Sequence, residues 1–202
     1  MRLLILDQRI YISLSDIGES LLMRHIIYTG LILIGCGDFN TGPSQNQSPV
    51  GPLVNLFAWT TTELPEDPFK EHWSDHVRCG EDEHGLELLA ENWAYSIQTG
   101  DCNWLTIEQP SLSAVHKGDI VRVEVWHFFL TAPEPTSARV GLATSDGILV
   151  EMMEPIPQPA RFIALEYKVQ QSIAQNTPIY FHISNHGSNS WHLLDIQINP
   201  QE

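Results

Sequence analysis

The most regular feature of this chain is a stretch in which apolar and polar residues alternate. Every second residue from Val121 to Val125 is valine, and the residues between them are charged. Successive side chains of an extended strand point to opposite faces, so this period of two predicts a β-strand with one buried face. We predict this strand over residues 120–130, with His127 on the face of the valines and Trp126 as a core residue.

Similar short apolar stretches, separated by turn residues, occupy most of the remaining chain. Ser145-Asp146-Gly147 is typical of a hairpin turn, and Pro155, Pro157 and Pro159 predict a stiff connector. Helical periodicity is nearly absent. The pattern therefore predicts an all-β fold, namely an antiparallel β-sandwich of the jelly-roll type. Strands are predicted at 54–61, 86–89, 93–99, 104–109, 120–130, 138–144, 148–153, 162–172, 178–184 and 190–198.

One apolar run near the N-terminus has no such alternation. Residues 26–34 follow two basic residues and end at Gly35 and Cys36, which is the layout of a secretory signal peptide. Nine residues of helix reach only about half of a bilayer core of roughly 30 Å, so a transmembrane helix is not expected. Because Met23 directly precedes the basic residues, translation is expected to begin there. The alternative is an unusually long leader over residues 1–22.

The tetrapeptide Leu33-Ile34-Gly35-Cys36 resembles the lipobox of bacterial lipoproteins. The resemblance implies that residues 1–35 are removed and that Cys36 is acylated, with chains such as palmitate anchoring the protein in a membrane. Gly37 in place of Asp resembles lipoproteins sorted to the outer membrane, so we expect a place in the bacterial cell envelope, facing the periplasm or the exterior. The alternative is a buried strand that ends in Gly-Cys-Gly.

Residues 38–52, with the sequence DFNTGPSQNQSPVGP, contain almost no apolar side chains. Such a segment cannot bury enough surface to fold by itself, and it is typical of a tether. We therefore expect a signal peptide over 1–35, a lipidated cysteine and tether over 36–52, and a single β-sandwich domain over 53–202.

Charge and cysteine content narrow the possible partners. The net charge of −15 repels phosphate backbones, so nucleic acid is not expected to bind. With Cys36 assigned to lipid, Cys79 and Cys102 remain as a pair in an exported chain, where disulfides persist. We predict a disulfide between them. Two free thiols, or half of a metal site, are the alternatives.

A group of polar and aromatic residues lies close to the C-terminus. The group consists of His182, Asn185, His186, Asn189 and Trp191. We expect these residues at the tip of a hairpin that joins the last two strands, with the indole partly exposed. A flat aromatic face and side-chain amides suit a sugar, because the ring packs on the first and the hydroxyls bond to the second. The hypothesis is a noncatalytic site for a glycan or another polar small molecule.

The segment 189–198, Asn-Ser-Trp-His-Leu-Leu-Asp-Ile-Gln-Ile, resembles the final strand of galactose-binding-like jelly-rolls, which include many carbohydrate-binding modules. The resemblance extends over about residues 118–198 and rests mainly on the length and spacing of the predicted strands. It implies a carbohydrate-binding domain. The structural calcium site of many such modules has no counterpart that we can place, so no cofactor is expected.

Two alternative functions remain open from the sequence. His127, His182 and His186 together could bind Zn or Cu, because neutral imidazole suits both metals. The competing interpretation of His127 is a core histidine. A structural envelope protein without a small ligand is the other alternative. The motifs Gly-x-Ser-x-Gly and His-Glu-x-x-His are missing, so the sequence favours binding over catalysis.

Overall fold

The computed structural model describes residues 49–73, 77–185 and 187–199, all of which belong to one compact unit, 41–202. The predicted signal peptide, Cys36 and most of the predicted tether lie outside the described residues. Within the described part of the chain, no helix is long and apolar enough to cross a membrane.

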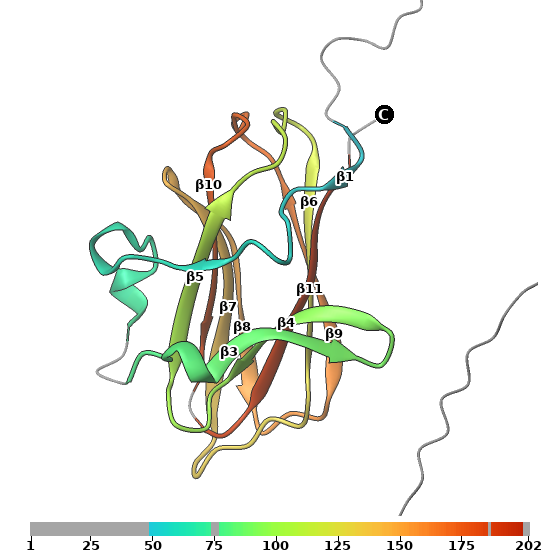
Figure 1. Ribbon diagram of the computed structural model, residues 1–202. Coiled ribbons are helices and arrows are strands. Elements are labelled where there is room, and N and C mark those ends of the chain that lie inside the picture. The colour runs from blue at the N-terminus through green and yellow to red at the C-terminus, as the bar shows by residue number, and fades with distance from the viewer. Residues whose placement is uncertain (1–48, 74–76, 186, 200–202) are drawn as a thin grey trace, which may run out of the picture. The chain divides into compact units, whose positions relative to one another are not determined.

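The described residues form two antiparallel β-sheets packed face to face (Figure 1). The first has the order β3-β4-β11-β6-β9, with β1 also paired to β11. Its strands are β3 His84–Leu89, β4 Asn92–Gln98, β11 Ser190–Asn199, β6 Ile120–His127, β9 Arg161–Lys168 and β1 Gly51–Pro52. The second has the order β2-β5-β10-β7-β8. Its strands are β2 Thr60–Thr61, β5 Trp104–Pro110, β10 Pro178–Ser184, β7 Thr136–Thr144 and β8 Gly147–Ile156.

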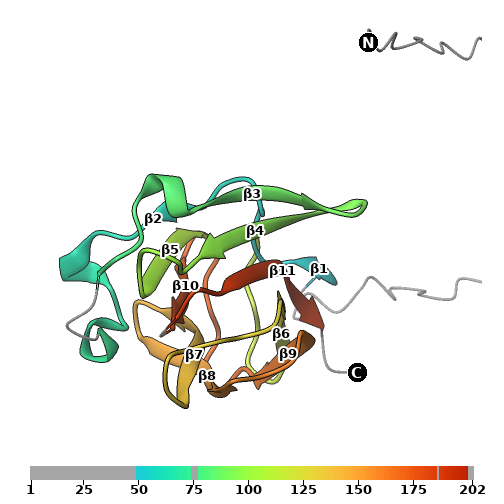
Figure 2. The same cartoon turned by 90° about the horizontal axis from the view of Figure 1, so that it is seen from below.

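The order of the strands confirms the predicted jelly-roll sandwich. Among the strands of the described residues, only β3–β4 and β7–β8 are hairpins within one sheet, and the other connections from β4 onward pass from one sheet to the other. In the described part of the chain that precedes β3, three short 3-10 helices are formed by Leu64–Glu66, Lys70–His72 and Glu81–Glu83. Figure 2 shows the two layers end-on, with the β3–β4 hairpin extending beyond the rest of its sheet.

The core lies between the sheets, and the predicted alternation along β6 is confirmed. Val121, Val123 and Val125 are fully buried, whereas the residues between them face outward. The strand ends at His127 rather than at residue 130. Trp126 was assigned to the core, and this is wrong: it shares the outer face with Arg122 and is only half-buried.

The strand predicted at 162–172 ends at Lys168, and two further assignments differ from the prediction for a clear physical reason. Within 54–61, only Thr60–Thr61 is a strand. Upstream of it, the side-chain amide of Gln109 replaces a strand partner, because it donates to Asn55 O at 2.9 Å and accepts from Asn55 N at 2.8 Å. Strand β8 continues through Pro155, where a connector was expected. Proline is tolerated there because β8 is an edge strand, so an N–H on its open side has no ladder partner to lose.

Residues 62–73 and 77–79 lie over part of the outer face of the second sheet. Fully buried Phe69 packs with Ala143 and Tyr180 on this face. The predicted disulfide between Cys79 and Cys102 is confirmed, with a Cα–Cα distance of 4.8 Å. It fastens the end of the covering segment to the chain just before β5, and closing such a loop stabilises the fold by about 3 kcal/mol.

Because Gly141 has no side chain, the ring of Phe69 can pack directly against its backbone. A Cβ at this position would lie 2.5 Å from Phe69 Cε1. We expect Phe69→Ala to lower the free energy of unfolding by about 3–5 kcal/mol through the cavity it leaves. Gly141→Ala should cost about 1–3 kcal/mol through overlap with the ring.

The two substitutions should not be additive. Once the ring is removed, the alanine methyl at position 141 enters empty space, so Gly141→Ala should cost almost nothing in the Phe69→Ala background. Urea unfolding of the four proteins measures the coupling, which should exceed about 1 kcal/mol. Additive losses would show that Phe69 does not seal this face.

Candidate functional site

The residues expected at an exposed hairpin tip do not form one. β10 and β11 belong to different sheets, so the chain between them crosses the end of the sandwich instead of forming a hairpin. Trp191 was expected to be partly exposed, yet it is 1 % exposed and belongs to the core cluster. Its ring lies against that of His127, with centroids 4.8 Å apart. A buried indole offers no platform for a ligand, and this assignment is corrected.

Asn185 and Asn189 are also buried, and their amides brace the end of the sandwich. Asn189 Nδ2 donates to Asn185 Oδ1 at 3.0 Å and to Thr131 O at 3.0 Å. Asn185 Nδ2 donates to Thr99 Oγ1 at 2.7 Å. Gly187 lies in the same crossing with φ of +120°, and a Cβ there would lie 2.0 Å from Thr131 O. The polar cluster therefore stabilises a crossing of the chain, with its hydrogen bonds made internally.

The histidines considered as metal ligands lie on different faces. His182, on β10, faces outward beneath Phe69, whose ring stacks on it with centroids 4.6 Å apart. His127, on β6, faces inward against Trp191, and its Nε2 lies 3.6 Å from Glu154 Oε1. His186 lies outside the described residues. Among the residues that are described, no group of three His, Cys, Asp or Glu is placed to hold a metal ion.

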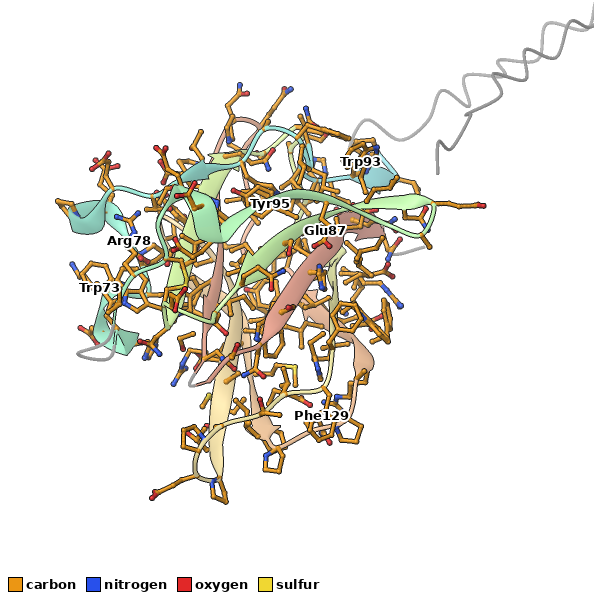
Figure 3. The ribbon with its side chains drawn as sticks, turned by 60° about the horizontal axis from the view of Figure 1, so that its bottom comes forward. Trp73, Arg78, Glu87, Trp93, Tyr95 and Phe129 are labelled. Atoms are coloured by element: carbon orange, nitrogen blue, oxygen red, sulfur yellow. A yellow bond between two sulfur atoms is a disulfide. The ribbon has the colours of Figure 1, made fainter. Side chains whose placement is uncertain are left out.

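A groove lies elsewhere, on the outer face of the first sheet. Its volume is about 630 Å³. It runs between the end of the β3–β4 hairpin and the middle of β6 and β11. Figure 3 shows this face with the hairpin in front of β11 and with Trp93 near the hairpin end. The lining residues are Leu89, Ala90, Asn92, Trp93, Glu124, Trp126, Phe128, Leu194 and Asp195.

The groove opens where the pairing of β11 changes. β4 pairs with residues 190–193 of β11 and then diverges, and β1 pairs with residues 197–198. Between these stretches, the register of β11 against β6 shifts by one residue between Leu193 and Asp195. Such a bulge re-aims side chains. As a result Leu194 and Asp195, although adjacent in sequence, both line the groove.

Aromatic rings form one side of this groove and continue beyond it. Phe128 is 50 % exposed and meets Trp126 edge to face, with centroids 6.1 Å apart. Its other neighbour is His192, whose ring centroid lies 5.3 Å away. Phe162, on β9, pairs with Trp126 across the strands and is 47 % exposed. These rings present an apolar surface to solvent that the fold itself does not require.

His192 supports this surface from below. Burial lowers the pKa of its imidazole, and the nearby Glu87 carboxylate, 3.6 Å from Nδ1, raises the pKa by a smaller amount. At neutral pH the ring is therefore uncharged and packs as an aromatic neighbour of Phe128. This is the physical role we assign to it.

Polar groups lie beside the rings and are held in fixed positions. Asp195 stands directly opposite Glu124 in the pairing of β11 with β6. Asp195 Oδ1 accepts from Ile196 N and Oδ2 accepts from Gln197 Nε2, both at 2.7 Å. Glu124 Oε1 accepts from Arg122 Nε at 2.8 Å. Carboxylate oxygens have further lone pairs, so both side chains can still accept hydrogen bonds from a ligand.

The sequence did contain a signal for this groove. Trp126 and Phe128 alternate in step with Arg122 and Glu124, which places both aromatic side chains on the charged and therefore outer face. Neighbouring aromatic residues on the solvent face of a strand form a contiguous apolar patch, and such patches mark binding surfaces. The bulge that adds Asp195 has no comparable signal.

No family model and no curated protein matches this chain. Among solved structures it is similar to the mannan-recognising carbohydrate-binding module TmCBM27, with TM-score 0.46 and 5% identity, over 77% of this chain and 99% of that chain. It is also similar to TmCBM61 in complex with beta-1,4-galactotriose, with TM-score 0.40 and 8% identity, over 72% and 90% of the two chains. A third is the CBM22-1 xylan-binding domain of Paenibacillus barcinonensis Xyn10C, with TM-score 0.38 and 12% identity, over 78% and 97%.

The buried His182 makes stability depend on pH. Burial lowers the pKa of its imidazole to about 3, whereas in the unfolded chain the pKa is about 6.5. The unfolded chain therefore binds this proton first as the pH falls. The resulting stability is fully present above about pH 6.5 and is lost progressively towards about pH 3.

We expect His182→Gln, which keeps a hydrogen-bonding group near Thr106 Oγ1, to flatten this dependence. Urea unfolding at a series of pH values from neutral to acidic, on the variant and the original chain, measures the two slopes. The carboxylates contribute equally to both, so they cancel in the comparison. Parallel stability curves would contradict the burial of a neutral imidazole at this position.

Proposed function

We propose that this protein is a cell-envelope lipoprotein whose β-sandwich binds a glycan, without catalysis, in the groove on the outer face of the first sheet. The observation that carries the proposal is the combination of exposed rings and fixed acceptors. Trp126 and Phe128 line the same groove as Asn92, Glu124 and Asp195.

A sugar fits the chemistry of this combination. A pyranose presents apolar C–H groups on its faces and hydroxyl groups around its edge. Aromatic rings offer broad apolar contact area with little conformational entropy to lose, and carboxylate and amide groups accept hydroxyl protons. The β3–β4 hairpin borders the groove on one side, and an extended chain of sugars can lie across the sheet.

The proposal places the ligand on the outer face of the first sheet, where aromatic rings are accessible to solvent. On the opposite sheet, residues 62–73 and 77–79 cover part of the outer face, where Trp73 stacks on Trp104 at 4.8 Å and Arg78 lies 5.6 Å from the Trp104 ring. A ligand over Trp104 would have to displace these residues, which the Cys79–Cys102 disulfide fastens to the chain before β5. On the first sheet, the rings of Trp93, Phe128 and Phe162 are already accessible, each about half exposed.

Trp126→Ala should reduce glycan binding by about tenfold or more, because the ring supplies much of the apolar contact. The measurement is retention on a glycan array that covers neutral and charged polysaccharides. Phe129→Ala is the matched control: Phe129 is 57 % exposed and lies far from Trp93 in Figure 3. Equal retention of both variants would rule out the groove as the site.

The membrane anchor is the second part of the proposal, and it is supported by the lipobox-like tetrapeptide that ends at Cys36. Cys36→Ser should prevent acylation and release the protein into the soluble fraction. Labelling with a radioactive fatty acid, together with membrane fractionation, tests this. A Cys36→Ser protein that still sediments with membranes would contradict lipid anchoring while leaving glycan binding untouched.

A further inference from the structure

We propose that the groove selects glycans that contain an amino sugar, with the protonated amine placed between Glu124 and Asp195. This inference rests on the proposed glycan binding and goes further, because it names the chemical group that is recognised. It is carried by the charges that line the groove and by their positions relative to the rings.

The two carboxylates stand against each other. They face one another across β6 and β11, where Cβ atoms of directly opposite residues are about 4.5–5.5 Å apart and like charges destabilise the sheet. The bulge in β11 creates this pairing, because a regular ladder would place Asp195 on the other face. A cation bound between them would relieve the repulsion.

The surrounding side chains neutralise this charge only in part. Among the described residues that line the groove, every charged side chain is acidic. Arg122 lies beside the pair: its Nε donates to Glu124 Oε1 at 2.8 Å and its Nη1 donates to Glu166 Oε1 at 3.1 Å. The Arg122 guanidinium is thus shared between Glu124 and Glu166. Asp195 accepts hydrogen bonds only from uncharged donors, namely the Ile196 backbone amide and the Gln197 side chain.

Besides the carboxylates, the groove contains aromatic rings, which also attract cations. The face of an aromatic ring attracts an ammonium group, and tryptophan does so best. Trp126 neighbours Glu124 on the outer side of β6, and the Trp93 ring closes the groove from the hairpin, where it is steadied by an edge contact with Phe57 at 5.8 Å. Glu124 is only 25 % exposed at its side chain, and partial burial strengthens its interaction with a charge.

A neutral sugar would pack on the aromatic rings but would leave the two carboxylates without a cation. A uronic acid would be repelled by the carboxylates. An amino sugar satisfies both, because its ammonium donates three hydrogen bonds to groups that only accept. The expected order of affinity is therefore amino sugar, then neutral or acetylated sugar, then uronic acid.

Isothermal titration calorimetry of the full chain in detergent tests this order at about pH 6, where carboxylates are ionised and amines protonated. The probes are oligomers of glucosamine, N-acetylglucosamine and galacturonic acid, with trilysine as a cation that is not a sugar. We expect the glucosamine oligomer to bind at least about tenfold more tightly than the acetylated one. Added salt should reduce this difference.

Asp195→Asn should remove most of the preference while retaining binding of the acetylated oligomer. Asp146→Asn is the matched control, since Asp146 is an exposed carboxylate in the turn between β7 and β8 of the other sheet and does not line the groove, and the preference should survive. Equal affinity for both glucosamine forms, or equal binding of trilysine, would overturn the amino-sugar inference. If neither these oligomers nor the glycan array shows binding, the proposed function itself fails.

Discussion

Strand β11 has to satisfy different partners along its two edges, and the outer face of the first sheet depends on how it does so. Backbone N–H and C=O groups must find partners when buried, so β11 is paired with β6 on one side and with β4 and then β1 on the other. β4 leaves before β1 arrives. Leu53 N, which donates to Ile196 O at 2.7 Å, serves the backbone in this interval, and the groove lies where the two partners change over.

The fold follows from the alternation of residues, whereas the site does not. Valines at every second position of β6 specify which face is buried, and the hairpin turn at 145–147 specifies its two strands. Whether consecutive strands pair or cross between sheets is decided by contacts distant in sequence. This is why the chain between β10 and β11 was assigned to a hairpin, and why Trp191 was placed at its tip.

The sequence also could not distinguish polar residues that bind a ligand from polar residues that support the backbone. Asn185 and Asn189 have the chemistry of a sugar site, yet their amides are consumed by a crossing of the chain. His182 is buried in neutral form beneath Phe69. In contrast, Trp126 was missed as a site residue because a tryptophan in mid-strand was assumed to belong to the core. The charged residues on the same face of the strand indicated an outer position. A one-residue bulge then brought Asp195 to the same surface, and nothing in a regular period of two signals such a shift.

The β3–β4 hairpin ends in a short turn beside the groove, where Ala90 has φ of +55°. Because the last residues of this hairpin contribute little to the core, the turn can lengthen or change composition without disturbing the packing between the sheets. Mutation can therefore alter what the groove recognises at little cost to folding. In evolutionary terms, selection can act on ligand choice and on stability almost independently, and related chains are expected to diverge first at this turn.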